Sequence, residues 1–428
     1  MSKVRVAVVG GGFAGIAAAI SAKKAGADVV LFEKTDMLAG SGLRAGRMNF
    51  NGKLVAAEEA KALGGGDVFE ALESILLHRG NIVDELHGYI YDTSKVDTVM
   101  QRLVNEAGVE LRIESRVDDV ENTGGVIKSI RVNKKEKVKA DVFIDSPGTS
   151  GGMNICKRYG QGCIMCICYR CPAYGDRFSI ATKAGAPSYN RVRPDGTPGA
   201  VGSAVLINKT TLAPDLLRRM EKEGAIGIPL PKELIDYSKE KMIGGVRSRR
   251  QMEYINLVDI GSTAKCVGLG YFNLRQLRSI PGFEYAQYDE PMAGGKFNKI
   301  SKVDMCARDN SLKVEGFNNL FAAGEKCGPG TGIGECILSG FVAGHNAVRV
   351  AAGKAPVILP RETVSGDFIA YTGEKMKTPG GLNQGYSFGM GEFFERMKDQ
   401  GVYTTDVAAI HKKINGLQLK GVFAKKVT

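Results

Sequence analysis

The stretch Val4–Glu33 reads VRVAVVGGGFAGIAAAISAKKAGADVVLFE and contains every part of a nucleotide-binding βαβ unit. A short apolar run ends at three consecutive glycines, an alanine-rich helix is expected from Ala14 to Ala25, and a second apolar run ends at Glu33. Strand, glycine turn, helix, strand and acid in this order form the dinucleotide-binding fingerprint. Glu33 can accept hydrogen bonds from ribose hydroxyls, and its charge would repel the 2′-phosphate of NADP. The stretch therefore predicts an α/β fold with a parallel sheet.

Each glycine of this fingerprint has its own expected role. Gly10 permits the tight turn after the first strand, Gly12 lets the backbone approach a pyrophosphate, and Gly15 lets the helix pack close to the strand. The helix is expected to begin at Ala14, where free N–H groups and the positive end of the helix dipole attract phosphates. We therefore expect the phosphates of a dinucleotide at this helix end.

A second piece of the same fold is expected near the other end of the chain. Residues 320–347 read LFAAGEKCGPGTGIGECILSGFVAGHNA, in which an apolar strand ends at Gly324-Glu325 and a helix begins near Glu335. The order of the two pieces resembles the glutathione-reductase-type FAD superfamily. Residues 320–371 are most similar to the GidA-type tRNA-modifying flavoproteins and the folate- and FAD-dependent tRNA uridine methyltransferases, which carry LF-F-A-G-Q-x-x-G, then G-x-x-E, then SG-x-x-AG-x-N-A. The resemblance implies a Rossmann-like FAD-binding domain built from both chain ends, with an inserted α+β substrate domain.

The resemblance also implies which residues contact FAD. Gly324 and Glu325 would meet the ribityl–pyrophosphate region, Thr331–Gly334 would approach the isoalloxazine, and Val117 would contact the adenine end. The glycine-rich segment after Glu33 can wrap an extended ligand with its backbone N–H groups. The expected FAD contacts are Gly10, Gly12, Phe13, Ala14, Gly15, Glu33, Lys34, Gly42, Arg44, Val117, Gly148, Gly324, Glu325, Thr331, Gly332 and Ile333.

The chain departs from the tRNA enzymes at two places. Position 325 is Glu where those enzymes usually have Gln, and the methyltransferase cysteine near the flavin has no counterpart within residues 34–50. The predicted function is therefore that of an enzyme, an FAD-dependent oxidoreductase passing electrons between flavin and a small-molecule substrate or a redox partner protein. A flavin- and folate-dependent RNA uridine methyltransferase-like enzyme and a non-catalytic flavoprotein electron-transfer subunit are the alternatives.

The expected organisation follows from the position of the two pieces. Residues 1–150 and 303–355 form the FAD-binding domain, residues 151–302 form the inserted cysteine-containing substrate domain, and residues 356–428 form a mixed or helical cap.

Local patterns predict the elements between the two pieces. Within the first part, Lys53–Tyr91 is expected to be mostly helical. Asp97–Ala107 has the apolar spacing of an amphipathic helix, and Val109–Val132 alternates as in a β-hairpin meander.

Five cysteines lie close together in the inserted region: Cys156, Cys163, Cys166, Cys168 and Cys171. Four converging thiolates could hold an iron–sulfur cluster. A redox dithiol beside the flavin needs only a CxxC pair, and Cys163 and Cys166 are then the candidate catalytic thiols. Buried inert thiols, or a structural zinc, are the third interpretation. The spacing leaves all three open.

Composition narrows the class of protein further. Of 428 residues, 58 are Lys or Arg and 46 are Asp or Glu, so the net charge of +12 favours anionic partners such as a dinucleotide, an acidic metabolite or RNA. The four histidines show no metal-ligand spacing. No apolar run is long enough to span a bilayer and no export signal is evident, so a cytoplasmic protein without a membrane partner is expected. An oligomer is compatible with this sequence.

Overall fold

The computed structural model describes residues 3–44, 49–51, 53–81, 87–148, 178–189, 203–237, 253–259, 264–268, 273–288, 305–330, 332–382, 385–389 and 391–428. Its central element is a parallel sheet whose described strands follow the order β17-β10-β1-β2-β6. These strands are β1 (Arg5–Val9), β2 (Asp28–Phe32), β6 (Glu110–Arg112), β10 (Val142–Asp145) and β17 (Leu320–Ala322). Because β17 pairs with β10 and β10 pairs with β1, both ends of the chain build one sheet. This confirms the predicted α/β fold.

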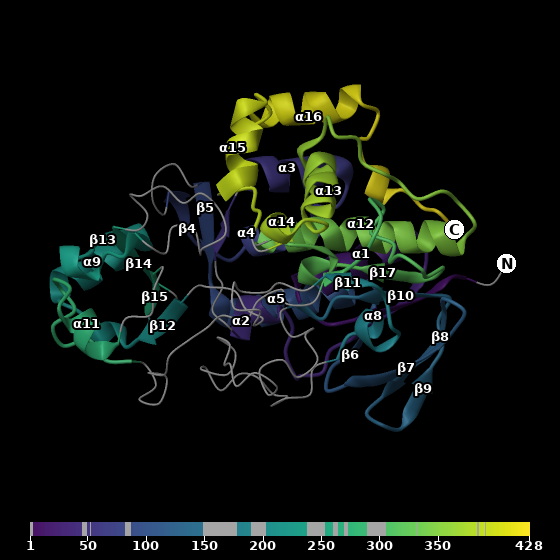
Figure 1. The fold of residues 1–428 in the computed structure, drawn as a ribbon, viewed down its shortest axis with the longest axis horizontal. Coiled ribbons are helices and arrows are strands. Elements are labelled where there is room, and N and C mark those ends of the chain that lie inside the picture. Colours follow the sequence, from purple (N-terminus) through teal and green to yellow (C-terminus); the bar gives the residue numbers. More distant parts are fainter. Residues whose placement is uncertain are drawn as a thin grey trace.

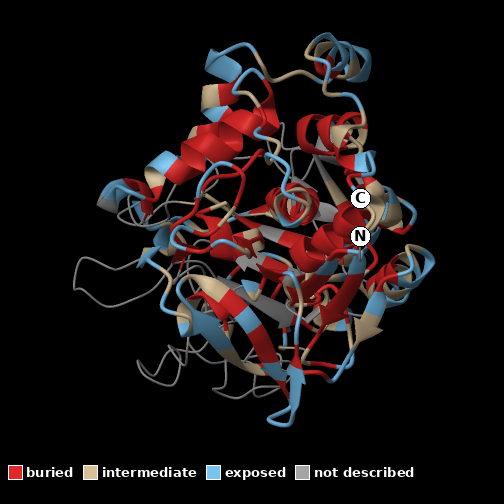
Figure 2. Ribbon diagram, turned by 90° about the vertical axis from the view of Figure 1, so that its right-hand side faces the viewer, coloured by how far each residue is buried: buried red, intermediate tan, exposed pale blue. Residues whose placement is uncertain are grey.

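Two long helices pack against each other over this sheet, α1 (Phe13–Lys24) and α12 (Ile333–Ala351) (Figure 1). Their contact depends on two glycines of α12. A Cβ added to Gly340 would lie 2.3 Å from the carbonyl oxygen of Ala14, and one added to Gly344 would lie 2.2 Å from that of Ala18. The SGxxAG pattern therefore places the two helix backbones in direct contact, and almost every residue of α1 is buried. Figure 2 shows that buried segments run through the middle of the molecule and that the two termini lie close together at one side.

The meander predicted after residue 109 is confirmed. Strands β7 (Val117–Thr123), β8 (Val126–Val132) and β9 (Glu136–Val138) form an antiparallel sheet. The helix predicted before them is also present, as α5 (Thr93–Glu106), and it begins earlier because Asp92 caps it by accepting a hydrogen bond from the Ser94 amide.

The prediction of a mostly helical Lys53–Tyr91 is wrong over its last part. Helices α3 (Lys53–Leu63) and α4 (Asp67–Glu73) form as expected, but β4 (Leu76–Asn81) and β5 (His87–Tyr91) follow as antiparallel strands. The run Tyr89–Tyr91 is aromatic and β-branched, a composition that favours strands. A distant partner, β3 (Asn49–Asn51), completes the sheet on the other edge of β5, and no local pattern reveals such a partner.

The inserted region contains a separate antiparallel sheet of described strands in the order β12-β15-β14-β13, at the left of Figure 1. The strands are β12 (Ser203–Ile207), β13 (Ala225–Pro229), β14 (Tyr254–Asp259) and β15 (Ala264–Gly268). Helices α9 (Pro214–Glu223) and α11 (Leu274–Arg278) accompany this sheet, and its buried apolar residues form a core of their own. The domain boundaries given above remain predictions.

The tail is helical, with α13 (Val364–Lys375), α14 (Pro379–Leu382), α15 (Gly391–Asp399) and α16 (Val407–Gly416). Helices α15 and α16 lie at the top of Figure 1. Glu59 of α3 ties this tail to the first part of the chain. Its buried carboxylate accepts hydrogen bonds from the amides of Val364 (3.1 Å) and Ser365 (2.7 Å). These amides lie in the first turn of α13, where backbone N–H groups have no acceptor within the helix itself. Within the described residues, no helix is long and apolar enough to cross a membrane.

Candidate functional site

The N-terminus of α1 presents free backbone donors. Gly12 is its N-cap with an extended backbone (φ −76°, ψ 175°), no described side chain caps the helix, and the first turn holds no acidic residue. A Cβ added to Gly12 would meet no described atom within 4 Å. The first-turn N–H groups and the positive helix end therefore face a space that suits a phosphate.

The neighbouring glycines face protein instead. Gly10 has φ +109°, and a Cβ there would lie 2.3 Å from the carbonyl oxygen of Ser146; one on Gly15 would lie 1.8 Å from the carbonyl oxygen of Gly10. Ser146, directly after β10, holds this turn by donating its hydroxyl to the carbonyl of Val9 at 2.9 Å. Sequence reasoning missed Ser146, although a small polar residue directly after a buried strand was the available signal.

Glu33 lies at the end of β2 and is 7% exposed. Its Oε2 accepts from the Gly11 amide (2.8 Å), and its Oε1 accepts from the amide (2.9 Å) and the hydroxyl (2.8 Å) of Thr35. The carboxylate thus holds the glycine turn in place. A carboxylate oxygen accepts up to two hydrogen bonds, so Oε2 can also take one from a ribose hydroxyl.

Val117, the predicted adenine contact, lies in the same region as Glu33. The amide of Ser115 donates to the carbonyl of Glu33 (2.8 Å), so the chain entering β7 at Val117 runs alongside the end of β2. Lys34 follows Glu33 directly and is partly exposed.

The segment after β2 approaches the glycine turn. A Cβ on Gly40 would lie 3.2 Å from the Cα of Gly12. At Gly42, in the short helix α2 (Ser41–Arg44), an added Cβ would lie 2.2 Å from the ring of Phe13, and the Tyr91 hydroxyl donates to the Gly42 carbonyl (3.1 Å). Gly42 is therefore needed for packing against protein. Arg44 ends α2, and its side chain is outside the described part.

The two pieces of the site meet at Gly324. This residue has φ +69° and begins the 3₁₀ turn η5 (Gly324–Cys327), and a Cβ on it would lie 3.0 Å from the Cβ of Ala14 in the first turn of α1. Its amide donates to the Ser339 hydroxyl of α12 (2.8 Å). The turn predicted to hold the ribityl region thus lies directly beside the helix end predicted to hold the phosphates.

Buried charged groups lie within η5 and next to it. Glu325 and Lys326 are 4% and 1% exposed, and the ammonium of Lys326 donates to the Thr182 hydroxyl (2.6 Å). Asp145, at the carboxyl end of β10, accepts from the Ser179 hydroxyl at 2.5 Å. Burial raises the pKa of Asp145, and the positive charge of Lys326 acts in the opposite direction. Sequence reasoning missed both Asp145 and Lys326.

The second helix of the site begins at Gly332, which caps α12 with an extended backbone and without a described side-chain cap. Ile333 follows and is buried. Thr331 lies outside the described residues. Gly148, at the carboxyl edge of the sheet, has φ +61°, and a Cβ on it would meet no described atom within 4 Å.

The cysteine cluster lies wholly outside the described residues. The predicted catalytic thiols Cys163 and Cys166 and the predicted iron–sulfur ligands Cys156, Cys163, Cys166, Cys168 and Cys171 therefore stay predictions. In the part that the structure describes, no group of three or more His, Cys, Asp or Glu residues could hold a metal ion.

Two family models match the chain over the two pieces of this site. The FAD dependent oxidoreductase model matches residues 5–151, which include the glycine turn and Glu33, and the Glucose inhibited division protein A model matches residues 271–355, which include η5 and α12. Together the two matches support an FAD-dependent oxidoreductase of the GidA type. FAD is accordingly its cofactor, and the uncapped end of α1 beside Gly12 fits the diphosphate of that cofactor.

Solved structures agree with the GidA-type fold. GidA of Aquifex aeolicus superposes with a TM-score of 0.67 and 17% identity in each of two crystal forms. The match covers 97% of this chain and 75% of that protein in form II, and 99% and 76% in form I. A geranylgeranyl bacteriochlorophyll reductase-like protein from Thermoplasma acidophilum reaches 0.50 with 16% identity over 97% of this chain and 96% of that protein. At these identities the similarity shows the fold alone.

Proposed function

We propose that the chain passes an electron pair between FAD and a small substrate or a redox partner protein, at the carboxyl edge of the parallel sheet. The contact between Gly324 and Ala14 carries this proposal, because it lets one extended nucleotide be held from both chain ends. FAD, when bound, accepts and releases two electrons. The protein binds the nucleotide, orients its ring and controls which reactant reaches it.

Residues of the two pieces would contact different parts of FAD. The first turn of α1 would hold the pyrophosphate with backbone N–H groups, as its uncapped amides support. Glu33 would accept a hydrogen bond from the ribose of the adenosine half while it anchors the Gly11 amide. Gly324 and Glu325 would contact the ribityl chain.

We further propose that the cysteine segment exchanges electrons with the flavin. Support comes from the residues that flank it. Asp145, three positions before Gly148, holds Ser179 and the Ala181 amide (3.0 Å), and Lys326 of η5 holds Thr182. The described residues on either side of 149–177, Asp145 and Ser179–Thr182, thereby lie close to the turn that would contact the ribityl chain. A disulfide between Cys163 and Cys166 would be reduced to two thiols by two electrons and two protons; an iron–sulfur cluster would take electrons singly.

One preparation tests both proposals. The protein is purified without oxygen, its visible spectrum is recorded, and flavin, iron and acid-labile sulfide are measured. A flavin spectrum without iron, together with two thiols that become alkylated only after flavin reduction, supports the dithiol relay. Iron with matching sulfide supports the cluster. A C163S/C166S double variant that is reoxidised by its acceptor at the wild-type rate would overturn a role for these thiols.

RNA is a second candidate partner, because the net charge of +12 favours polyanions and the GidA family model matches residues 271–355. The test is the affinity for transfer RNA as a function of salt concentration. Binding that weakens steeply with salt, together with folate-dependent methylation, would support the RNA uridine methyltransferase alternative. Absence of binding at low salt removes it.

A further inference from the structure

Glu335 occupies an unusual place at the start of α12. It is a carboxylate in the first turn of the helix and is 4% exposed. Its side chain folds back over the helix end, since a Cβ added to Gly332 would lie only 2.0 Å from its Oε2. We define the flavin-facing turn as Pro329, Gly330, Gly332 and Ile333, the described residues around the position where the isoalloxazine is expected. Glu335 therefore lies against this turn.

The other oxygen of Glu335 reaches a part of the chain far away in sequence. Its Oε1 accepts a hydrogen bond from the amide of Phe388 at 2.7 Å, and Phe388 is fully buried. Residues 386–388, named here the tail segment, also run beside the turn. The Tyr386 amide donates to the Pro329 carbonyl (2.9 Å), and Tyr386 forms a parallel bridge with Gly330.

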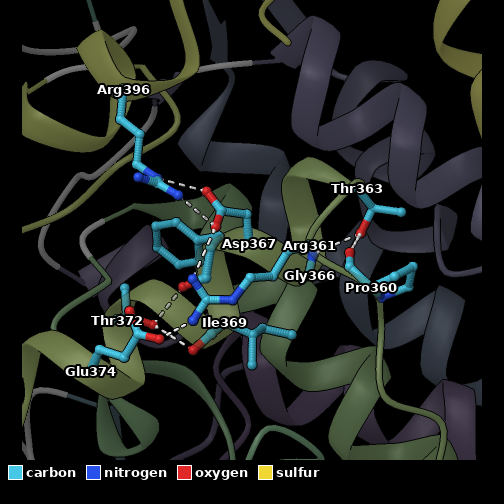
Figure 3. Close-up of polar contacts among 10 residues, drawn as sticks. Pro360, Arg361, Thr363, Gly366, Asp367, Ile369, Thr372, Glu374 and Arg396 are labelled. Carbon is cyan, nitrogen blue, oxygen red and sulfur yellow. Dashed lines mark hydrogen bonds and ion pairs between the residues drawn. The ribbon is translucent and has the colours of Figure 1, made fainter. Parts of the chain in front are cut away.

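The tail segment is itself held firmly. The ring of Phe368 on α13 packs on that of Phe388 (4.5 Å between centroids) and lies under Gly330, where an added Cβ would approach it to 3.1 Å. Helix α13 is joined to α15 by Arg396, which donates two hydrogen bonds to the buried Asp367 at 2.8 and 3.0 Å (Figure 3). The flavin-facing turn is thus held between α12 and the aromatic side chains of Phe368 and Phe388 in the C-terminal region.

We propose that Glu335 is a positioning residue for the flavin, and that it makes the tail segment a part of the cofactor site. This inference rests on the proposed function, because it assumes that FAD occupies the space beside the turn. The Glu335–Phe388 hydrogen bond fixes the shape of the turn. The negative charge of Glu335 also opposes the positive end of α12, and so lowers the stabilisation that this helix end gives to an electron-rich reduced ring.

Two substitutions separate the hydrogen bond from the charge. Glu335→Gln keeps an acceptor for the Phe388 amide and removes the charge. Its FAD affinity should stay close to that of the wild type, while the flavin reduction potential becomes more positive. Glu335→Ala removes both, so FAD should bind about tenfold more weakly or worse, in addition to the shift in potential.

The control is Glu392→Gln on α15. Glu392 is also a partly buried carboxylate of the C-terminal region. Among the described residues its hydrogen-bond partners are Lys375 (2.6 Å) and the Tyr371 hydroxyl, which both lie on α13 and not in the flavin-facing turn. FAD dissociation constants, reduction potentials and apoprotein melting temperatures are measured for all four proteins. A potential shift in Glu335→Gln but not in Glu392→Gln, at equal melting temperature, supports the proposal. Wild-type affinity and potential in both Glu335 variants overturn it. A wild-type protein that binds no FAD would instead refute the proposed function.

Discussion

Gly12→Ala separates the binding of FAD from the stability of the fold. The backbone of Gly12 (φ −76°, ψ 175°) is open to alanine, and the new Cβ would meet no described atom within 4 Å. The free energy of unfolding should therefore change little or rise by about 0.4–1 kcal/mol, because alanine restricts the unfolded chain. The same methyl group would enter the space in front of the α1 amides. Overpacking there should cost the complex about 1–3 kcal/mol, a loss of about 5- to 150-fold in FAD affinity.

Gly15→Ala is the matched comparison, since its Cβ would lie 1.8 Å from the Gly10 carbonyl oxygen. The helix must move away from the strand, so the apoprotein should lose about 3 kcal/mol or more of unfolding free energy. The assay is urea unfolding of each apoprotein, followed by FAD titration monitored by flavin fluorescence. If Gly12→Ala binds FAD as tightly as the wild type, the space beside Gly12 does not hold the phosphates and the reasoning fails.

Three further predictions concern groups that hold the fold around the site. His345 is buried on α12, its ring nitrogens have no hydrogen-bond partner among the described residues, and burial together with Arg349 lowers its pKa to about 4. Because the folded pKa lies below the unfolded value of about 6.5, the free energy of unfolding should be constant above pH 6.5 and fall by roughly 3 kcal/mol as the pH drops to 4. His345→Phe should abolish this loss in a pH series of thermal melts. Glu59→Ala leaves two buried amides of α13 without their acceptor and should cost about 3 kcal/mol in urea unfolding, whereas an unchanged midpoint would show that the capping contact contributes nothing. Arg308→Met removes the buried guanidinium that donates to the carbonyls of Cys327 (2.9 Å) and Ile369 (2.7 Å). It should lower the free energy of unfolding by about 2–4 kcal/mol and weaken FAD binding. An unchanged free energy of unfolding and an unchanged FAD affinity would contradict a role of Arg308 in fixing η5.

Local signals account for what the sequence predicted well. The glycine turn, α1 and the end of β2 follow from spacing within thirty residues, and the structure forms them as expected. The second piece was found because the turn at Gly324 and the small residues of α12 have their own patterns. Their meeting with α1 follows from the need of Gly340 and Gly344 to contact the α1 backbone.

Contacts between distant residues account for what was missed. Lys326 meets Thr182 across 144 positions, and Phe388 meets Glu335 across 53, so neither pair leaves a periodic trace in the sequence. Strands β4 and β5 form where the sequence predicts helix, because their stability depends on pairing with each other and with β3, which local propensity does not encode.

The central claim is that the two chain ends hold one FAD between the end of α1 and η5. It is tested most directly by equilibrium titration of the apoprotein with FAD, in parallel with Gly12→Ala. The account predicts a yellow wild-type complex with one flavin for each chain, and a folded variant that binds far more weakly. A wild-type protein that stays colourless after incubation with FAD would contradict it.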